Sequence, residues 1–120
     1  SFVCHSKVVG TTFHKDIPWA ELKPGDRLEL KHENNKHDSQ AVAVFRGLTK
    51  MGYVSKTLVP ALNMGADTAN FWAEISGITG GGDRNHGCNI KIFSNNAAQI
   101  RAAAPVAGAQ AKSYTPAAGE

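Results

Sequence analysis

The chain has 120 residues, the length of one domain, and its 42% hydrophobic content is ordinary for a globular fold. Its net charge of +3 is mildly basic, which permits an acidic partner such as nucleic acid without demanding one. No apolar run is long enough to span a bilayer, and the first residues lack the basic and apolar segments of a signal peptide, so we expect no membrane partner.

The composition changes near Asn95. Residues 95–120 are rich in Ala and contain only three sizeable apolar side chains, those of Ile100, Val106 and Tyr114. So little apolar surface cannot offset the entropy lost when such a segment is ordered. We therefore predict a folded domain over residues 1–94 and a mostly disordered tail or linker over residues 95–120, in which residues 98–104 could form a short helix.

The first half of the predicted domain alternates strands with turns. We expect a strand over residues 2–13 with a bulge at Gly10, a helical turn over residues 16–22 capped by Asp16, and a type II turn over residues 23–26. Residues 27–31 alternate polar and apolar side chains, which predicts a half-buried strand. Residues 41–45 are apolar throughout, which is typical of a strand covered on both faces.

The second half of the predicted domain continues this pattern. A short strand over residues 51–54 precedes a helix that Thr57 caps and Gly65 ends. Strands over residues 71–78 and 88–93 are joined by a flexible, glycine-rich hairpin over residues 80–85. About six strands and one or two short helices indicate a mainly β fold, a small six-stranded barrel of the OB-like or SH3-like type.

The cysteines and histidines show no pattern of a redox or metal site. Without a secretion signal, we expect Cys4 and Cys88 to be reduced thiols packed as small apolar groups, since a disulfide would require the first and last strands to meet. None of the five histidines has a spacing that zinc sites favour. We therefore predict no metal and no cofactor.

Common catalytic motifs are also missing from the sequence. The glycine run over residues 80–82 is not followed by the Lys and Ser or Thr of a phosphate-binding loop, and there is no Gly-x-Ser-x-Gly elbow. The carboxylates are scattered singly, with no pair that the sequence places together. We predict that the chain works by binding rather than as an enzyme.

The loop expected over residues 33–40 is far more polar than a hairpin needs. Asn and Asp side chains bond to their own backbone and can make such a loop rigid. A rigid loop would hold Asp38 as a fixed acceptor and His37 as a flat ring on which a base can stack. The residue types alone favour a simpler interpretation, in which the polarity only builds the turn.

Three groups of residues, in order along the chain, closely resemble the HIRAN domain family. They are Val9-Gly10; the series Leu28, Leu30, Glu33, Asn35, Asp38, Ala41, Val42 and Val44; and the run Met51-Gly52-Tyr53-Val54-Ser55-Lys56 with Leu58. The similarity covers residues 7–94. HIRAN domains are small OB-like barrels that occur alone in bacteria or fused to remodelling helicases.

The resemblance implies a module that binds single-stranded DNA at its 3′ end and serves DNA repair or replication-fork processing. Its partners would be single-stranded DNA or DNA ends, with a fused or associated helicase or nuclease. It would act in the cytoplasm, at the nucleoid, in a bacterium, or in the nucleus of a eukaryote.

The resemblance also implies which residues bind DNA. Asp38 would accept a hydrogen bond from the terminal 3′-hydroxyl. His37 stands where a characterised family member has a stacking Tyr, and Thr12 where it has a phosphate-binding Arg. The rings would stack bases, and Lys36 and Lys56 would supply charge, with Arg84 as a further cation. The full predicted set is Thr12, Phe13, His14, Lys36, His37, Asp38, Tyr53 and Lys56.

Other interpretations stay open. Phe13 could belong to the core, Lys56 could be an ordinary solvated residue, and Asp38 could only cap a turn. The whole domain could instead be a protein-interaction or scaffolding module without nucleic-acid affinity, docking through an exposed Trp19 or through an open edge of the first or last strand. A third hypothesis is a metal-dependent hydrolase that uses His14, His37 and Asp38.

Overall fold

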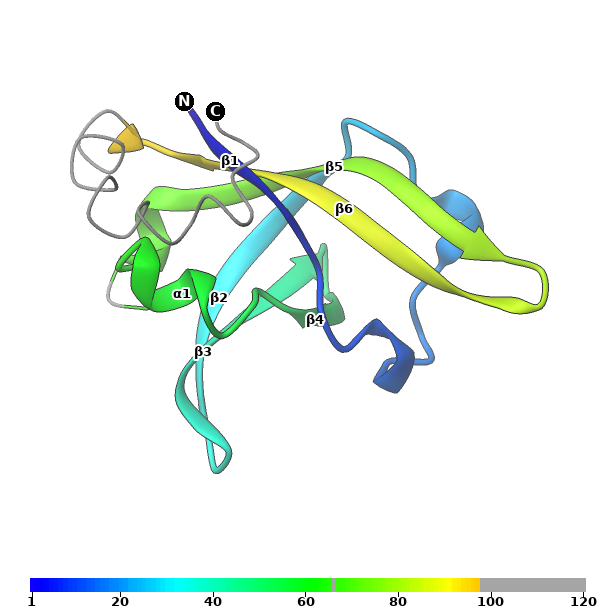
Figure 1. The fold of residues 1–120 in the computed structure, drawn as a ribbon, viewed down its shortest axis with the longest axis horizontal. Coiled ribbons are helices and arrows are strands. Elements are labelled where there is room, and N and C mark those ends of the chain that lie inside the picture. The colour runs from blue at the N-terminus through cyan, green and yellow to red at the C-terminus, as the bar shows by residue number, and fades with distance from the viewer. Residues whose placement is uncertain (66, 98–120) are drawn as a thin grey trace.

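Six antiparallel strands form a single sheet in the computed structural model, which describes residues 1–65 and 67–97 (Figure 1). The strands are β1 (Phe2–Lys7), β2 (Arg27–Asn35), β3 (Asp38–Arg46), β4 (Thr49–Tyr53), β5 (Phe71–Gly81) and β6 (Arg84–Ser94). Their order in the sheet is β1-β6-β5-β2-β3-β4. The prediction of a mainly β, OB-like fold is confirmed.

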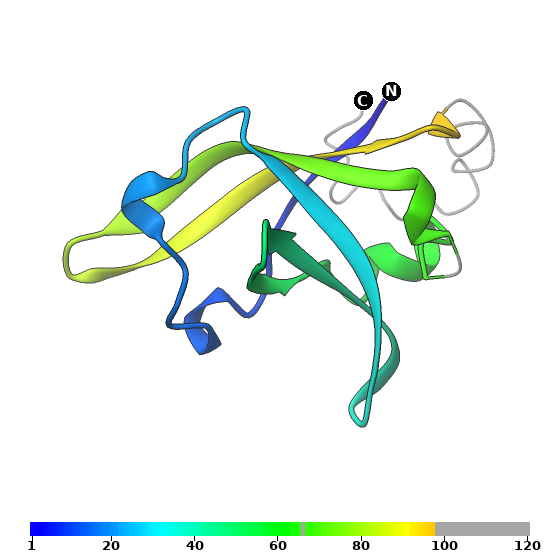
Figure 2. The same cartoon turned by 180° about the vertical axis from the view of Figure 1, so that it is seen from behind.

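The sheet closes into a barrel where the chain after β1 meets the end of β4. Val9 and Tyr53 form a bridge in which the Val9 N–H donates to the Tyr53 carbonyl at 2.8 Å and the Tyr53 N–H donates to the Val9 carbonyl at 2.9 Å. Figure 2 shows β2 leaving the layer of β5 and β6 and continuing into the hairpin with β3 that projects from the barrel. The bridge therefore joins the first and last strands of the sheet order.

The core lies inside the barrel and follows the alternation of the strands. Phe71, Ala73 and Ile75 of β5 are buried, while the residues between them are half-exposed. Residues 41–44 of β3 are all buried, as their unbroken apolar run predicts. Helix α1 (Leu58–Ala61) adds Leu58 and Val59 to the same core. This packing fixes the position of α1 beside the β2–β3 hairpin.

Short 3₁₀ turns replace parts of two predicted elements. The first strand ends at Lys7 rather than at residue 13, because Gly10 takes a left-handed φ of 80° and starts the turn η1 (Thr11–Phe13) instead of forming a bulge. The predicted helical turn is η2 (Trp19–Glu21), which begins after Pro18, so Asp16 does not cap it. A third such turn, η3 (Thr68–Asn70), precedes β5.

The predicted helix is shorter than expected, and the predicted type II turn is present. Helix α1 ends at Ala61 rather than at Gly65, and Asn63 takes the left-handed φ of 53° expected near a helix end. Thr57 occupies the N-cap position without a capping bond from its side chain. The Asp26 N–H donates to the Lys23 carbonyl at 3.1 Å with Gly25 at a φ of 95°, as a type II turn requires. No helix in the described residues is long and apolar enough to cross a membrane.

The chain remains attached to the barrel just beyond β6. The Asn95 N–H donates to the Asn70 carbonyl at 3.0 Å, the Asn96 amide donates to Asp67 at 3.2 Å, and Ala97 is buried. These three residues belong to the segment over residues 95–120 that the sequence predicts to be a tail. The helix predicted over residues 98–104 and the rest of the predicted tail lie outside the described residues.

The first and last strands do meet, yet Cys4 and Cys88 are thiols. Cys88 is buried, and its burial raises the pKa of the thiol to about 11. Cys4 is half-buried and packs against the core. Both therefore act as the small apolar groups that the sequence predicts.

Gly52 permits the close approach that closes the barrel. A Cβ at this position would lie 2.3 Å from the Val9 carbonyl oxygen, far inside van der Waals contact. We expect Gly52→Ala to reduce the free energy of unfolding by about 1–3 kcal/mol, as overpacked sites do, measured by urea denaturation. Gly77→Ala is the matched control within a strand, because its Cβ would have 4.0 Å of space. Equal stability of both variants would contradict this role of Gly52.

Candidate functional site

The polar segment over residues 33–40 is a long hairpin rather than the loop that the sequence predicts. β2 continues to Asn35 and β3 starts at Asp38, so only Lys36 and His37 form the turn. The Asn35 Oδ1 accepts from the backbone N–H of His37 at 2.9 Å and of Asp38 at 2.8 Å. Polar side chains thus extend the strands beyond the core and make the turn rigid.

Asp38 combines a structural contact with an available acceptor. Its Oδ1 accepts from the backbone N–H of Gln40 at 2.9 Å, so this carboxylate caps the turn. No other described group bonds to the half-buried carboxylate, so its Oδ2 can accept a further hydrogen bond. The cap fixes the orientation in which this second oxygen is held.

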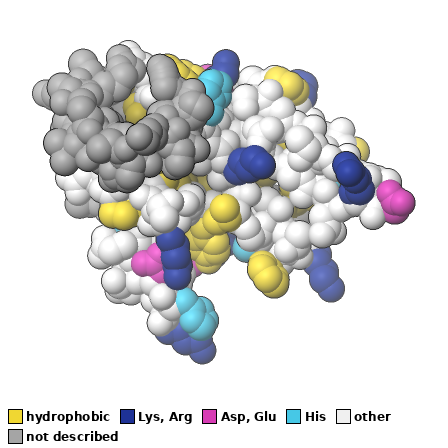
Figure 3. Space-filling view, viewed as in Figure 1, with side chains coloured by type: hydrophobic (Ala, Val, Ile, Leu, Met, Phe, Trp, Pro, Cys, Tyr) yellow, Lys and Arg dark blue, Asp and Glu magenta, His cyan; other side chains and the backbone are white. Residues whose placement is uncertain are grey.

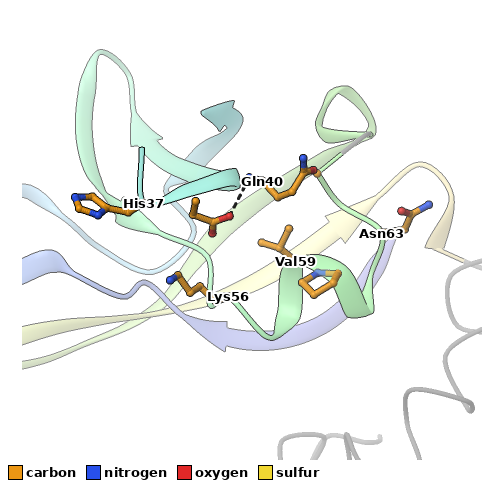
Figure 4. A pocket seen from close by; sticks show the side chains of 8 residues that line it. His37, Gln40, Lys56, Val59 and Asn63 are labelled. Carbon is orange, nitrogen blue, oxygen red and sulfur yellow. Dashed lines mark hydrogen bonds between the residues drawn. The ribbon is translucent and has the colours of Figure 1, made fainter. Parts of the chain in front are cut away.

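A pocket of about 430 Å³ lies between the hairpin and α1 (Figure 4). Figure 4 shows His37 and Lys56 toward one end of it and Asn63 at the other, with Val59 between. Within the described chain, neither Lys36 nor Lys56 has an ion pair, so both charges are uncompensated. The lining residues are His37, Asp38, Gln40, Lys56, Val59, Pro60, Asn63 and Gly65.

Glu33 links this hairpin to β4. Its carboxylate accepts from the Lys50 ammonium, from the Tyr53 hydroxyl at 2.6 Å and from the Asn35 amide at 2.9 Å. These bonds, that of Lys50 foremost, lower the pKa of Glu33 to about 2, and the same contact raises the pKa of Lys50. The Lys50 ammonium also lies 4.8 Å from the centroid of the Tyr53 ring.

The sequence interpretation included Glu33 only as part of a family pattern and missed Lys50. Glu33 comes just after the polar–apolar alternation of residues 27–31, which ends at the exposed His32, so the pattern does not show what Glu33 bonds to. Lys50 is 17 residues away from it, in β4. Only the pairing of β3 with both strands brings the two together.

A second group of predicted residues lies around η1 and Tyr53. Phe13 is 85% exposed, so the interpretation that it belongs to the core is wrong. The His14 Nδ1 lies 3.0 Å from the Gly10 carbonyl oxygen, and its ring meets that of Tyr53 edge-on with 6.3 Å between centroids. Thr12 is exposed beside them. This group presents rings and little charge.

The eight predicted residues therefore fall into two groups joined by a chain of hydrogen bonds. The chain runs from the Tyr53 hydroxyl through Glu33 to Asn35, which holds the backbone of His37 and Asp38. Arg84 belongs to neither group, since it starts β6 and does not line the pocket. Figure 3 shows basic and histidine side chains at the projecting end of the hairpin, with acidic groups next to them.

The structure bears on the residues named in two alternative interpretations, protein docking and metal-dependent hydrolysis. Trp19 is not an exposed docking residue: it is half-buried against the core and stacks on His86 with 4.7 Å between ring centroids. The last strand, β6, is not an edge strand, because it lies between β1 and β5. The first strand, β1, stands at one end of the sheet order, and Val9 just beyond it bridges to Tyr53 of β4. The described residues contain no group of three or more His, Cys, Asp or Glu side chains that could hold a metal ion.

A closed, OB-like barrel with a polar hairpin beside a short helix defines a small β-barrel binding module. Residues 1–79 match the model of the HIRAN domain, so the chain belongs to the HIRAN family, a family of DNA-binding modules. The resemblance drawn from the sequence is thereby confirmed. No match is found among curated proteins.

Two solved structures share the fold. A protein from Lactobacillus plantarum is 18% identical, with a TM-score of 0.57 over 76% of this chain and 93% of that one. The HIRAN domain of human HLTF is 16% identical, with a TM-score of 0.55 over 83% of this chain and 80% of that one. At these identities the likeness concerns the fold alone.

Removing the charge of Glu33 tests its role in holding the hairpin. Because the folded state lowers its pKa from 4.5 to about 2, this carboxylate stabilises the fold at pH values above 4.5, and the contribution is lost as the pH falls toward 2. We expect Glu33→Gln to reduce the free energy of unfolding by about 1–2 kcal/mol at pH 7, a value discounted for partial exposure. Urea denaturation at several pH values measures it.

The pH dependence separates this effect from a packing defect. The stability difference between the native protein and Glu33→Gln should shrink as the pH falls from 4.5 toward 2. Glu74→Gln removes a carboxylate at another half-exposed position in a strand and is the control for the substitution as such. A difference that is constant with pH would show that the charge of Glu33 does not stabilise the hairpin.

Proposed function

We propose that this domain binds single-stranded DNA at free 3′ ends and serves DNA repair or replication-fork processing. The observation that carries the proposal is the carboxylate of Asp38, which lines the pocket with one oxygen bonded to the Gln40 N–H and the other available. His37 and Lys56 line the same pocket. A pocket of about 430 Å³ lies within the range of sites for small ligands, so one terminal nucleotide is a suitable occupant.

The sign of the charge on Asp38 argues for recognition of an end. A carboxylate repels internal phosphates, so it is unfavourable in a DNA site unless it accepts from a donor. A free 3′-hydroxyl is such a donor, and the Oδ2 of Asp38 has the capacity to accept from it. A 3′-phosphate would bring negative charge to the same place.

The surrounding residues supply the other contributions that single-strand binding uses. The exposed rings of Phe13 and His37 offer faces on which bases can stack, at about 1–3 kcal/mol per base. Lys36 and Lys56 carry uncompensated charges for the phosphates. A module of this kind would act together with a fused or associated helicase or nuclease, in the compartment that holds the DNA, the nucleoid or the nucleus.

Asp38→Asn tests end recognition while preserving the turn. An Asn side chain can keep the bond from the Gln40 N–H through its carbonyl oxygen, and it then presents an amide donor where the acceptor was. We expect the native domain to bind a 3′-hydroxyl oligonucleotide roughly 10- to 100-fold more tightly than the 3′-phosphate form, the worth of a charge-assisted hydrogen bond. The variant should lose most of this preference, as measured by fluorescence anisotropy.

Asp83→Asn is the matched control, since it removes the same charge at the turn between β5 and β6. It should leave the preference unchanged. Equal binding of both ends by the native domain would refute recognition of 3′-hydroxyl ends. Failure to bind any DNA at low salt, together with a stable protein partner, would favour the scaffolding alternative.

Lys56→Gln tests the contact with phosphate. The logarithm of a single-strand binding constant falls with the logarithm of salt concentration by about 0.7 for each neutralised phosphate. Removing one such contact should therefore reduce the slope by about 0.7, measured by titration at several salt concentrations. Lys23→Gln is the control, because Lys23 lies on the turn before β2 and pairs with Asp26 at 3.7 Å. An unchanged slope for Lys56→Gln would mean that this lysine is only a solvated residue.

A further inference from the structure

One transverse row of side chains crosses all six strands on the outside of the barrel. The registers of the five strand pairs align Phe2 with Phe93, Phe93 with Trp72, Trp72 with Glu29, Glu29 with Phe45, and Phe45 with Lys50. We call these six residues the outer row. Directly paired residues point to the same face of a sheet, so the six side chains form one continuous line.

The aromatic members of the outer row do not belong to the core. Phe45, Trp72 and Phe93 are half-exposed and lie outside the buried hydrophobic cluster, while at least one sequence neighbour of each is buried within it. The Trp72 and Phe93 rings stack with 5.7 Å between centroids at an interplanar angle of 8°, and Phe2, which is 38% exposed, meets Phe93 edge-on at 5.9 Å. A sheet face that only contacts solvent gains nothing from large aromatic side chains, so four aromatic rings on one outward line need another explanation.

Cations are placed over these rings. The guanidinium carbon of Arg27 lies 5.0 Å from the centroid of Trp72, and the Lys31 ammonium lies 4.9 Å from that of Phe45. Glu29 lies between the two rings, but Arg27 pairs with it at 3.5 Å and offsets its charge. Five cations face outward on these strands against the three carboxylates of Glu29, Glu33 and Glu74; they are Lys7, Arg27, Lys31, Lys50 and Lys91.

The outer row is continuous with the candidate DNA site. It ends at Lys50, whose ammonium bonds to Glu33 and lies 4.8 Å from the centroid of the Tyr53 ring. Tyr53 in turn adjoins His14. A DNA strand that contacts the ring of Tyr53 therefore meets Lys50 next, and Phe45 is the residue paired with Lys50. Five steps between strands at about 4.8 Å give the row a length of roughly 24 Å.

We propose that the outer row is a second contact surface for the same single-stranded DNA, which it binds upstream of the 3′-terminal nucleotide. The inference rests on the proposed function. Rings interleaved with cations are the elements by which proteins bind single strands without regard to sequence, through base stacking and charge. OB folds engage about 4–16 nucleotides in this way. The pocket reads the end, and the outer row adds affinity that grows with length.

The test compares oligodeoxythymidylates of three and nine nucleotides, each with a 3′-hydroxyl, bound to the full chain. The native protein should bind the longer one about tenfold or more tightly, since even one additional stacked base is worth about 1–3 kcal/mol. Trp72→Leu and, separately, the double variant Arg27→Gln/Lys31→Gln should bind the longer oligonucleotide only as well as the shorter one. Both should keep the native affinity and 3′-hydroxyl preference for the short one.

The double variant guards against a folding defect, because Arg27 and Lys31 are exposed and no core contact depends on them. Lys23→Gln/Arg84→Gln removes the same charge elsewhere and should keep the length dependence. Length-independent binding by the native protein, with the 3′-hydroxyl preference intact, would overturn the outer row alone. So would binding of an acidic peptide such as poly-glutamate in preference to the longer oligonucleotide.

The two proposals fail in different ways. Equal binding of 3′-hydroxyl and 3′-phosphate ends, combined with a length dependence that the row variants abolish, would refute end recognition and support the outer row. Binding of neither oligonucleotide would refute both. Unchanged length dependence in the row variants would show that the rings only stabilise the sheet through cross-strand packing.

Discussion

The pairing of Val9 with Tyr53 is the constraint on which the rest of this domain depends. Its two backbone hydrogen bonds close the sheet, and they place η1 next to β4. The same residue, Tyr53, turns its hydroxyl to Glu33 and so connects the closed barrel with the projecting hairpin. One residue thus serves both the fold and the candidate site, and the lack of a Cβ at the preceding glycine is what lets the strands meet.

The hairpin has to be held in place because it extends beyond the core. Apolar burial fixes β2 and β3 only near the barrel, where Leu28, Leu30 and residues 41–44 are buried. Farther out, Glu33 and Asn35 replace burial with hydrogen bonds. A pocket wall built this way is ordered before any ligand arrives, and less conformational entropy is lost on binding. The polar segment therefore supplies rigidity, and in the proposed function it also supplies the acceptor of Asp38 for the DNA end.

The local features of this fold could be predicted from the sequence, and the non-local ones could not. Alternation in residues 27–31 and the apolar run at 41–45 identify strands correctly, because the faces of a strand that are buried must carry apolar side chains. The sequence does not predict where β2 and β3 meet at their turn, since paired polar residues outside the core follow no such pattern. The bond from Lys50 to Glu33 and the outer row both depend on registers across several strands. Asp38, by contrast, was singled out through the family resemblance, and the geometry adds the contact that orients it.

The departures from the characterised family member change how affinity must be distributed. Thr12 offers no cation, and the pocket itself is lined by one lysine, Lys56, with Lys36 at the neighbouring turn. Under the proposed function, such a site would discriminate an end by the acceptor of Asp38 but would gain little from phosphate attraction. Affinity would then come from residues farther along the DNA strand, such as the outward rings and cations of the outer row, which begins at Lys50. Selectivity and affinity would thus reside on different surfaces, joined where Lys50, Glu33 and Tyr53 meet.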